Sequence, residues 1–282
     1  MIMLPALASD ALGSFLATHM RSTFGFSNTH LLETIPPIAR LALECIGNSD
    51  ALYHNLEHTM LVTLAGHDIL RGRALLHSHV SPKDYAHFII ACLMHDIGYV
   101  RGILKQDGKD GYIVDPSGRK VQLAKGASDA ALFLYHVDRS KLFVLEHTEL
   151  MEGIDGPRIA RAIEYTRFPN NHCRGGEDGD EIGLLLRAAD LIGQLGDPHY
   201  IRKANALYYE FEETGLNKQL GYASPADLVN LYPQFYWKSV YPRIQLAIRY
   251  LNVTSSGRQW IANLYSNIFR AEQEIPLSGP QT

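Results

Sequence analysis

The sequence predicts a mainly α-helical fold, and three observations indicate it. Apolar residues recur at spacings of three and four along most of the chain, as they do on one face of a helix. Stretches with the alternating pattern of a strand are scarce. With 46% hydrophobic and 20% charged residues, the 282-residue chain has the composition of a globular protein. We therefore expect one all-α domain over residues 1–282, with its core at about residues 35–200 and C-terminal helices at residues 200–272.

The expected helices follow the chain in order. The first covers residues 35–46, where apolar residues recur at helical spacing from Ile38 onward. Residues 55–70 repeat this spacing, and the apolar run at residues 85–92 forms the next helix. Further helices are expected at residues 159–165, 182–195, 228–237, 244–251 and 260–269.

Two segments interrupt the helical pattern. In the first, residues 101–128, short apolar stretches flank the turn sequence DPSG at residues 115–118, which predicts a small β-hairpin near residues 111–123. The second, residues 168–181, is too rich in Gly, Asn and Asp to hold a helix. Long loops inside a compact domain often cover or shape a binding site, so both are of interest for function.

Composition excludes several classes of protein. A formal net charge of −4 argues against a generally basic nucleic-acid-binding protein. No apolar run approaches the length of about 20 residues that a membrane span needs. The apolar N-terminal stretch lacks the basic start of a signal peptide. The three cysteines, Cys45, Cys92 and Cys173, are too far apart for a thiolate zinc site and odd in number for a disulfide framework. We expect a cytoplasmic protein with neither a nucleic-acid polymer nor a membrane as partner.

Two histidine motifs and one aspartate carry the chemistry. His54 and His58 are four residues apart, which predicts that both lie on one helix face. His95 and Asp96 follow an apolar helix; neighbours on a regular helix point about 100° apart, so this pair can face one ion only where the helix ends. Asp190 lies in the apolar sequence LLLRAADLIGQL, where a buried carboxylate needs a compensating positive group.

Taken singly, each of these residues has an ordinary structural explanation: a hydrogen-bonded histidine in the core, a helix cap or an ion-pair partner. Taken together, His58, His95, Asp96 and Asp190 form a set of imidazole and carboxylate ligands suited to Mn, Mg, Fe or Zn. A set without thiolates also leaves room for water, which a catalytic metal site requires. The sequence predicts one or two divalent metal ions per chain.

The order H…HD…D resembles that of the HD superfamily of metal-dependent phosphohydrolases. The sequence YHNLEH is similar to the YHNxxH signature of its cyclic-nucleotide phosphodiesterase branch, and HDIGY is typical of the superfamily. The segment ARAIEYT is similar to the family segment that ends in Thr before the last ligand helix. The resemblance extends from Tyr53 to Leu195, about half of the chain, and implies an HD-type helical bundle.

The resemblance also implies roles for individual residues. His58 is the first metal ligand, His95 and Asp96 are the next two, and Asp190 completes the site. Asp96 is placed to bridge two metal ions, and His54 to act as the general acid that protonates the leaving oxygen. The expected reaction is attack of a metal-activated hydroxide on the phosphorus of a small phosphorylated molecule. A nearby carboxylate, with Glu57 as the candidate, would keep His54 protonated at neutral pH.

Other residues bear on the substrate. Phosphodiesterases of this branch carry a base-binding glutamine in a longer C-terminal half; no glutamine aligns with it here, and Gln194 and Gln245 are candidates. Arg101 follows the HD pair by five positions and is the candidate for binding a phosphate. An acidic residue that precedes the Ser of the helix after the motif in many small HD hydrolases is absent here, where the sequence reads KGAS at residues 125–128.

Three functions stay open from sequence alone. The first is a phosphohydrolase of nucleotide-like or other small phosphorylated molecules, including a cyclic-nucleotide phosphodiesterase. The second is an HD-fold diiron oxygenase, which needs additional ligands such as His147 or His172. The third is a non-catalytic HD domain that binds a ligand. The sequence leaves open which of these is correct, and whether the chain forms a homo-oligomer.

Overall fold

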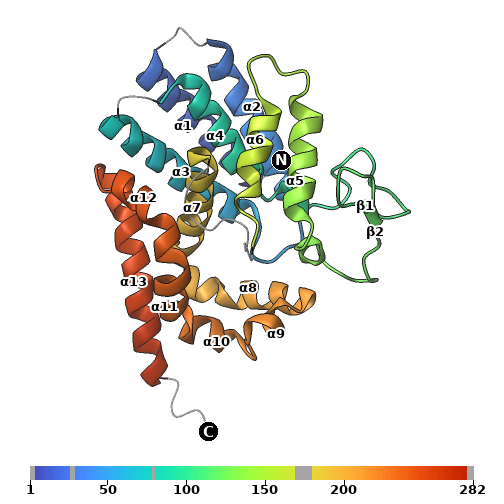
Figure 1. The fold of residues 1–282 in the computed structure, drawn as a ribbon, viewed down its shortest axis with the longest axis vertical. Coiled ribbons are helices and arrows are strands. Elements are labelled where there is room, and N and C mark those ends of the chain that lie inside the picture. The colour runs from blue at the N-terminus through green and yellow to red at the C-terminus, as the bar shows by residue number, and fades with distance from the viewer. Residues whose placement is uncertain (1–3, 26–28, 78–79, 169–179, 278–282) are drawn as a thin grey trace.

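The structure, a computed structural model, describes residues 4–25, 29–77, 80–168 and 180–277. Helices account for 72% of it and the strands form a single small hairpin, so the predicted all-α class is confirmed. Figure 1 shows the helices packed around one another, with the hairpin projecting at the side next to α5. Within the described residues, no helix combines the length and apolarity that crossing a bilayer requires.

The first half of the chain supplies four long helices and the segment that contains the hairpin. The helices are α1 (Leu4–Phe24), α2 (Thr29–Ile46), α3 (Leu56–His77) and α4 (Pro82–Met94). A 3₁₀ turn, η1 (Ile97–Tyr99), follows α4 directly. Strands β1 (Tyr112–Ile113) and β2 (Lys120–Val121) pair antiparallel, with Tyr112 opposite Val121, which confirms the hairpin expected near residues 111–123. A second 3₁₀ turn, η2 (Asp129–Leu132), leads to α5 (His136–Thr148).

The second half of the chain is helical throughout its described part. Its elements are α6 (Gly156–Glu164), α7 (Glu181–Leu195), α8 (Tyr200–Thr214), α9 (Leu216–Leu220), α10 (Pro225–Asn230), α11 (Tyr232–Phe235), a π-helical turn η3 (Tyr236–Val240), α12 (Tyr241–Leu251) and α13 (Ser255–Leu277). The single helix expected at residues 228–237 is therefore wrong. Pro233 has no N–H to donate, so the chain changes direction there and begins α11.

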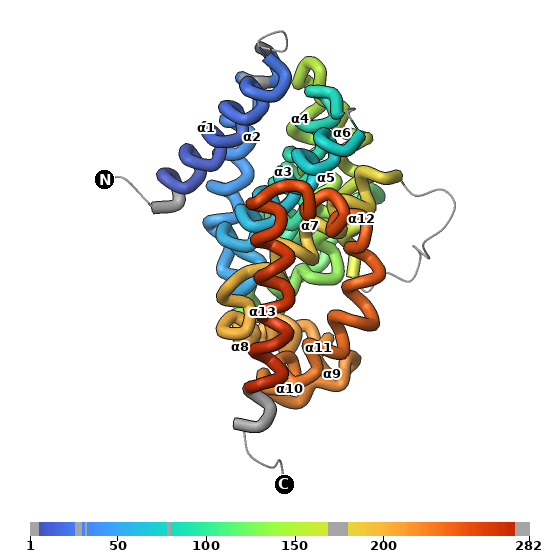
Figure 2. Tube along the Cα trace, turned by 90° about the vertical axis from the view of Figure 1, so that its left-hand side faces the viewer, coloured from blue at the N-terminus to red at the C-terminus, as the bar shows by residue number. Residues whose placement is uncertain are grey.

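Two hydrophobic clusters hold these elements together. The larger one joins α1–α4 with α5–α7 and the C-terminal helices. The smaller one packs Tyr53, Tyr99 and Phe133 against residues of α8 and α10, such as Leu207 and Leu228. Figure 2 shows α1 and α2 at one end of the molecule and α8–α11 at the other, with α13 running from the level of α3 down to α10. The candidate site lies at the boundary between the two clusters.

Candidate metal centre

His58 lies in the first turn of α3, and the side chain of Asn55 fixes where that helix begins. Its Oδ1 accepts hydrogen bonds from the backbone N–H groups of Glu57 and His58, at 3.0 and 3.3 Å, as an N-cap residue does. His54 consequently precedes the helix. The expectation that His54 and His58 share one helix face is therefore wrong, although their rings are in edge contact at 5.4 Å between centroids.

His95 and Asp96 stand where α4 ends, as the sequence predicted. The α4 helix begins with a capping box between Ser81 and Asp84 and ends at Met94, so that His95 is its C-cap. The Nδ1–H of His95 donates to the carbonyl of Cys92 at 2.9 Å, which leaves Nε2 as the ligand atom. Gly98 then lets α5 approach closely, because a Cβ there would lie 2.0 Å from the carbonyl oxygen of His136.

Asp190, on α7, meets these residues from the opposite side. His58 Nε2 lies 3.3 Å from Asp96 Oδ2 and 3.3 Å from Asp190 Oδ1. His95 Nε2 lies 3.0 Å from the same oxygen of Asp96 and 3.6 Å from that of Asp190. Neighbouring ligands of an octahedral ion with bonds of about 2.1 Å lie about 3 Å apart, so this spacing suits a divalent cation.

The charges and free lone pairs of the cluster also fit a cation. Both ring nitrogens of His58, Nε2 of His95 and Oδ2 of Asp96 are buried and have no hydrogen-bond partner among the described residues. Burial raises the pKa of Asp190, but contacts with His58 and His95 outweigh it and lower the pKa to about 2. Burial lowers the pKa of His95, whereas Asp96 and Asp190 raise it well above its usual value, so positive charge is favoured here. A divalent cation supplies that charge directly.

The spacing of these ligands depends on Gly193, one turn after Asp190 on α7. A Cβ at Gly193 would lie 2.7 Å from the Cα and 2.7 Å from the N of Val62, which is one turn after His58 on α3. Gly193→Ala is therefore expected to push α3 and α7 apart and to weaken Mn²⁺ binding about tenfold or more, as changes behind metal ligands do. Calorimetric titration of the chelator-treated protein with Mn²⁺ measures this.

Gly183→Ala is the matched control for Gly193→Ala. It lies on the same helix, and its Cβ would meet the ring of Tyr165 at 2.3 Å, far along the helix from Asp190. This variant should lose thermal stability yet keep the wild-type affinity for Mn²⁺. Equal Mn²⁺ affinities for the two variants would contradict a role of the Gly193 contact in setting ligand spacing.

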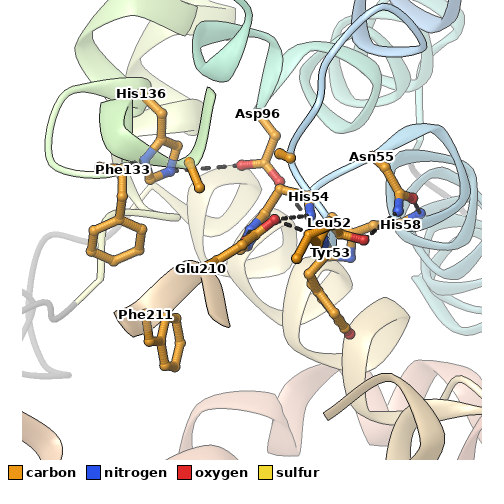
Figure 3. A network of polar contacts seen from close by, with 12 residues as sticks. Leu52, Tyr53, His54, Asn55, His58, Asp96, Phe133, His136, Glu210 and Phe211 are labelled. Atoms are coloured by element: carbon orange, nitrogen blue, oxygen red, sulfur yellow. Dashed lines mark hydrogen bonds and ion pairs between the residues drawn. The ribbon is translucent and has the colours of Figure 1, made fainter. Parts of the chain in front are cut away.

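His54 is held beside the ligands by Glu210, a residue of α8 that the sequence analysis missed. Its carboxylate bonds to Nδ1 of His54 at 2.5 Å and accepts the backbone N–H groups of Tyr53 and His54 (Figure 3). Burial lowers the pKa of His54, but the charge and hydrogen bond of Glu210 raise it to about 9. The partner expected from sequence, Glu57, instead pairs with Lys203 at 2.7 Å.

His136, which the sequence analysis did not single out, also faces the site. Its Nδ1 donates to the carbonyl of Phe133, and its Nε2 lies 3.7 Å from Oδ1 of Asp96, the oxygen turned away from His95 (Figure 3). Burial lowers the pKa of His136 to about 4 and keeps the ring neutral, as ligation requires. The ring of Tyr99 stacks between His54 and His136, at 4.7 and 4.4 Å between centroids. No local motif marks His136; only the fold brings it to Asp96.

A cavity of about 360 Å³ opens beside this cluster. His54, Asp96, His136 and Asp190 form part of its wall, and Gln194, a substrate-binding candidate from the sequence, also lines it. Its basic lining residues are Arg167, Arg187 and Arg243.

Two further candidates, Arg101 and His147, do not line the cavity. Arg101 is absent from its wall, and its guanidinium is bonded to Asp50, Asp129 and the carbonyl of Ala127. His147 stacks on Phe143 and donates from Nδ1 to that residue's carbonyl. His172 lies outside the described residues.

Comparison with known proteins gives one match. The model of the Npun_R2479-like family matches residues 5–274. The search among curated proteins found no match to the chain. Because the matched region contains every residue of the cluster and nearly the whole sequence, the protein belongs to the Npun_R2479-like family.

Proposed function

We propose that the protein is a metal-dependent phosphohydrolase of small phosphorylated molecules. One observation carries the proposal: Nε2 of His58 and Nε2 of His95 each lie within 3.6 Å of a carboxylate oxygen of Asp96 and of Asp190. Both aspartates line a cavity whose wall also contains the carboxylate-bound His54. The resemblance to HD phosphohydrolases names the same residues. We propose the cytoplasm as the site of action, since three widely spaced cysteines fit a reducing compartment.

The ligand set and the histidine beside it suit hydrolysis of a phosphoester. A divalent cation held by these four residues supplies Lewis acidity, which lowers the pKa of a water ligand and neutralises phosphoryl oxygens. Glu210 orients His54 through Nδ1, so that the opposite nitrogen is free to give its proton to the leaving oxygen. The low-dielectric wall formed by Tyr99 and Phe133 keeps bulk water from this proton.

Turnover by the chelator-treated protein with Mn²⁺ added back tests this proposal. The panel contains cyclic nucleotides, nucleoside monophosphates and an artificial aryl phosphodiester. We expect Asp96→Asn to reduce turnover to the rate seen without metal, because it removes the carboxylate charge shared by both histidines. Asp110→Asn, at a 73% exposed carboxylate paired with Lys120, is the control and should keep turnover within about twofold. Equal activities of the two variants would contradict the proposal.

A second candidate function, a diiron oxygenase, has one observation in its favour. The neutral ring of His136 offers Nε2 3.7 Å from Oδ1 of Asp96, so His136 and Asp96 would contribute ligands to a second ion. Iron content and O₂ uptake distinguish the two functions. Two irons per chain together with O₂ consumption would favour the oxygenase, and Mn²⁺-dependent ester hydrolysis without O₂ uptake the phosphohydrolase.

A further inference from the structure

The inner part of the cavity is apolar. Leu207 and Phe211 of α8 face it, and Leu228 of α10 and Val240 of η3 complete the buried wall. Leu220 of α9 is half-buried and lines the same region. Leu207, Phe211 and Leu228 belong to the smaller hydrophobic cluster, so this part of the wall is built by α8–α10 rather than by the helices that carry the metal ligands.

Few groups in this lining could read a nucleobase. Gln194 is the only side-chain amide among the described residues that line the cavity. The aromatic rings are largely occupied with one another: Phe211 meets Phe133 edge-on at 6.2 Å, and Tyr232 packs against Tyr200 at 5.0 Å. Base recognition needs hydrogen bonds to the edges of the base or a free stacking face, whereas this wall offers mainly aliphatic carbon and aromatic rings, several of which pack on one another.

The charged groups gather elsewhere in the cavity. On α7, Arg187, Asp190, Leu191 and Gln194 follow one another at helical spacing, so Arg187 lies one turn from the metal ligand Asp190 on the same lining face. Of the other arginines, Arg243 is exposed and Arg167 half-buried. A ligand that spans the cavity therefore meets cations and arginine at one part and buried hydrocarbon at the other.

We propose that the substrate is a phosphate ester whose alcohol part is an apolar chain or ring system, with the phosphate at the metal ligands and Arg187 and the apolar part against α8–α10. This inference rests on the proposed hydrolase function and adds the class of its substrate. An apolar group gains by leaving water, whereas a sugar and base would lose hydrogen bonds to water that this wall does not replace.

Binding of n-alkyl phosphonates, which resist hydrolysis, tests the inference. Methyl-, butyl- and octylphosphonate are titrated calorimetrically into the Mn²⁺-loaded protein. Affinity is expected to rise up to about fourfold for each methylene that is buried, with an increasingly negative heat-capacity change. A nucleoside phosphonate of similar size should bind more weakly than octylphosphonate.

Variants locate the effect in the wall. Leu220→Gln and Leu228→Gln should reduce the increase of alkylphosphonate affinity with chain length and leave methylphosphonate affinity unchanged. Because Leu220 is half-buried, its replacement tests the wall without disturbing the buried core. Leu150→Gln, at a 96% exposed leucine, is the matched control and should behave as wild type. Two results would overturn the inference about the substrate class and leave the proposed hydrolase function standing. One is methylphosphonate binding with an affinity that does not change with alkyl chain length, and the other is tighter binding of the nucleoside phosphonate than of octylphosphonate. Loss of all Mn²⁺-dependent phosphonate binding would instead count against the hydrolase function.

Discussion

Replacing Arg139 with leucine is expected to lower the free energy of unfolding by about 3–5 kcal/mol, the usual cost of removing one partner from a buried ion pair. The guanidinium of Arg139 is fully buried and all its N–H groups are used. It donates to both oxygens of Asp107, at 3.1 and 2.9 Å, and to the carbonyls of Gly98, Val100 and Ile113. Leucine would leave three carbonyls without the guanidinium donor and a buried carboxylate without its cation, held only by the backbone N–H groups of Ile113 and Leu104. Urea unfolding followed by circular dichroism measures the loss.

A control variant and a double variant test the Arg139 prediction further. Arg158→Leu removes an arginine whose ion pair with Asp84 is 27–30% exposed, and should cost about 1 kcal/mol or less. Arg139→Leu combined with Asp107→Leu should be more stable than Arg139→Leu alone, because no buried charge is left unpaired. If Arg139→Leu lowered the free energy of unfolding as little as Arg158→Leu, Arg139 would not be the residue that holds the segment at residues 101–128 against the turn after Asp96.

His54→Asn is expected to lower kcat about 10²–10⁴-fold for esters with alkoxide leaving groups, since it removes the proposed general acid. Mn²⁺ affinity should be preserved, because the four ligands are intact. With a p-nitrophenyl ester the loss should be small, because that leaving group departs without a proton. An equal loss for both kinds of ester would show that His54 only supports the structure.

The pH dependence of kcat gives a second test of the role of His54. The acid works when protonated, so the alkaline limb of the kcat profile should fall above the pKa of His54, about 9. Glu210→Gln removes the charge that raises this pKa and leaves the burial that lowers it, so the alkaline limb should move to lower pH. Glu213→Gln, an exposed neighbour on α8 that bonds to Ser128, is the control and should keep the wild-type profile.

The sequence predicted what is local and missed what depends on the fold. Helical periodicity located most of α7 and α12, because each buries one face, and the apolar sequences of α3 and α4 located most of those two more deeply buried helices. The expected start of α2 at residue 35 was late: Pro36 and Pro37, which normally mark a first turn, lie inside a helix that begins at Thr29. Helices α1 and α5 had no predicted counterpart.

The residues of the candidate site likewise divide into those that the sequence predicted and those that depend on the fold. His58, His95, Asp96 and Asp190 were predicted together because the motifs containing them are readable in the chain, and the structure brings their ligand atoms together. Glu57 was the named candidate for the carboxylate beside His54 because it is near in sequence, but its carboxylate pairs with Lys203 instead. Glu210 lies 156 residues further along, and no periodic pattern connects the two.

Glu210 lies on α8, and this position has a consequence for how such a protein can change during evolution. All the proposed cation ligands precede residue 195, whereas the group that sets the charge of His54 and the apolar wall of the cavity come from α8–α10. Under the proposed function, cation binding and ester cleavage therefore depend on separate stretches of the chain. Substitutions in α8–α10 alone would then exchange the accepted ester, or leave a protein that binds the cation without cleaving an ester, while H…HD…D stays intact. Within this family, the residue aligned with Glu210 should separate catalysts from binders better than the HD pair does.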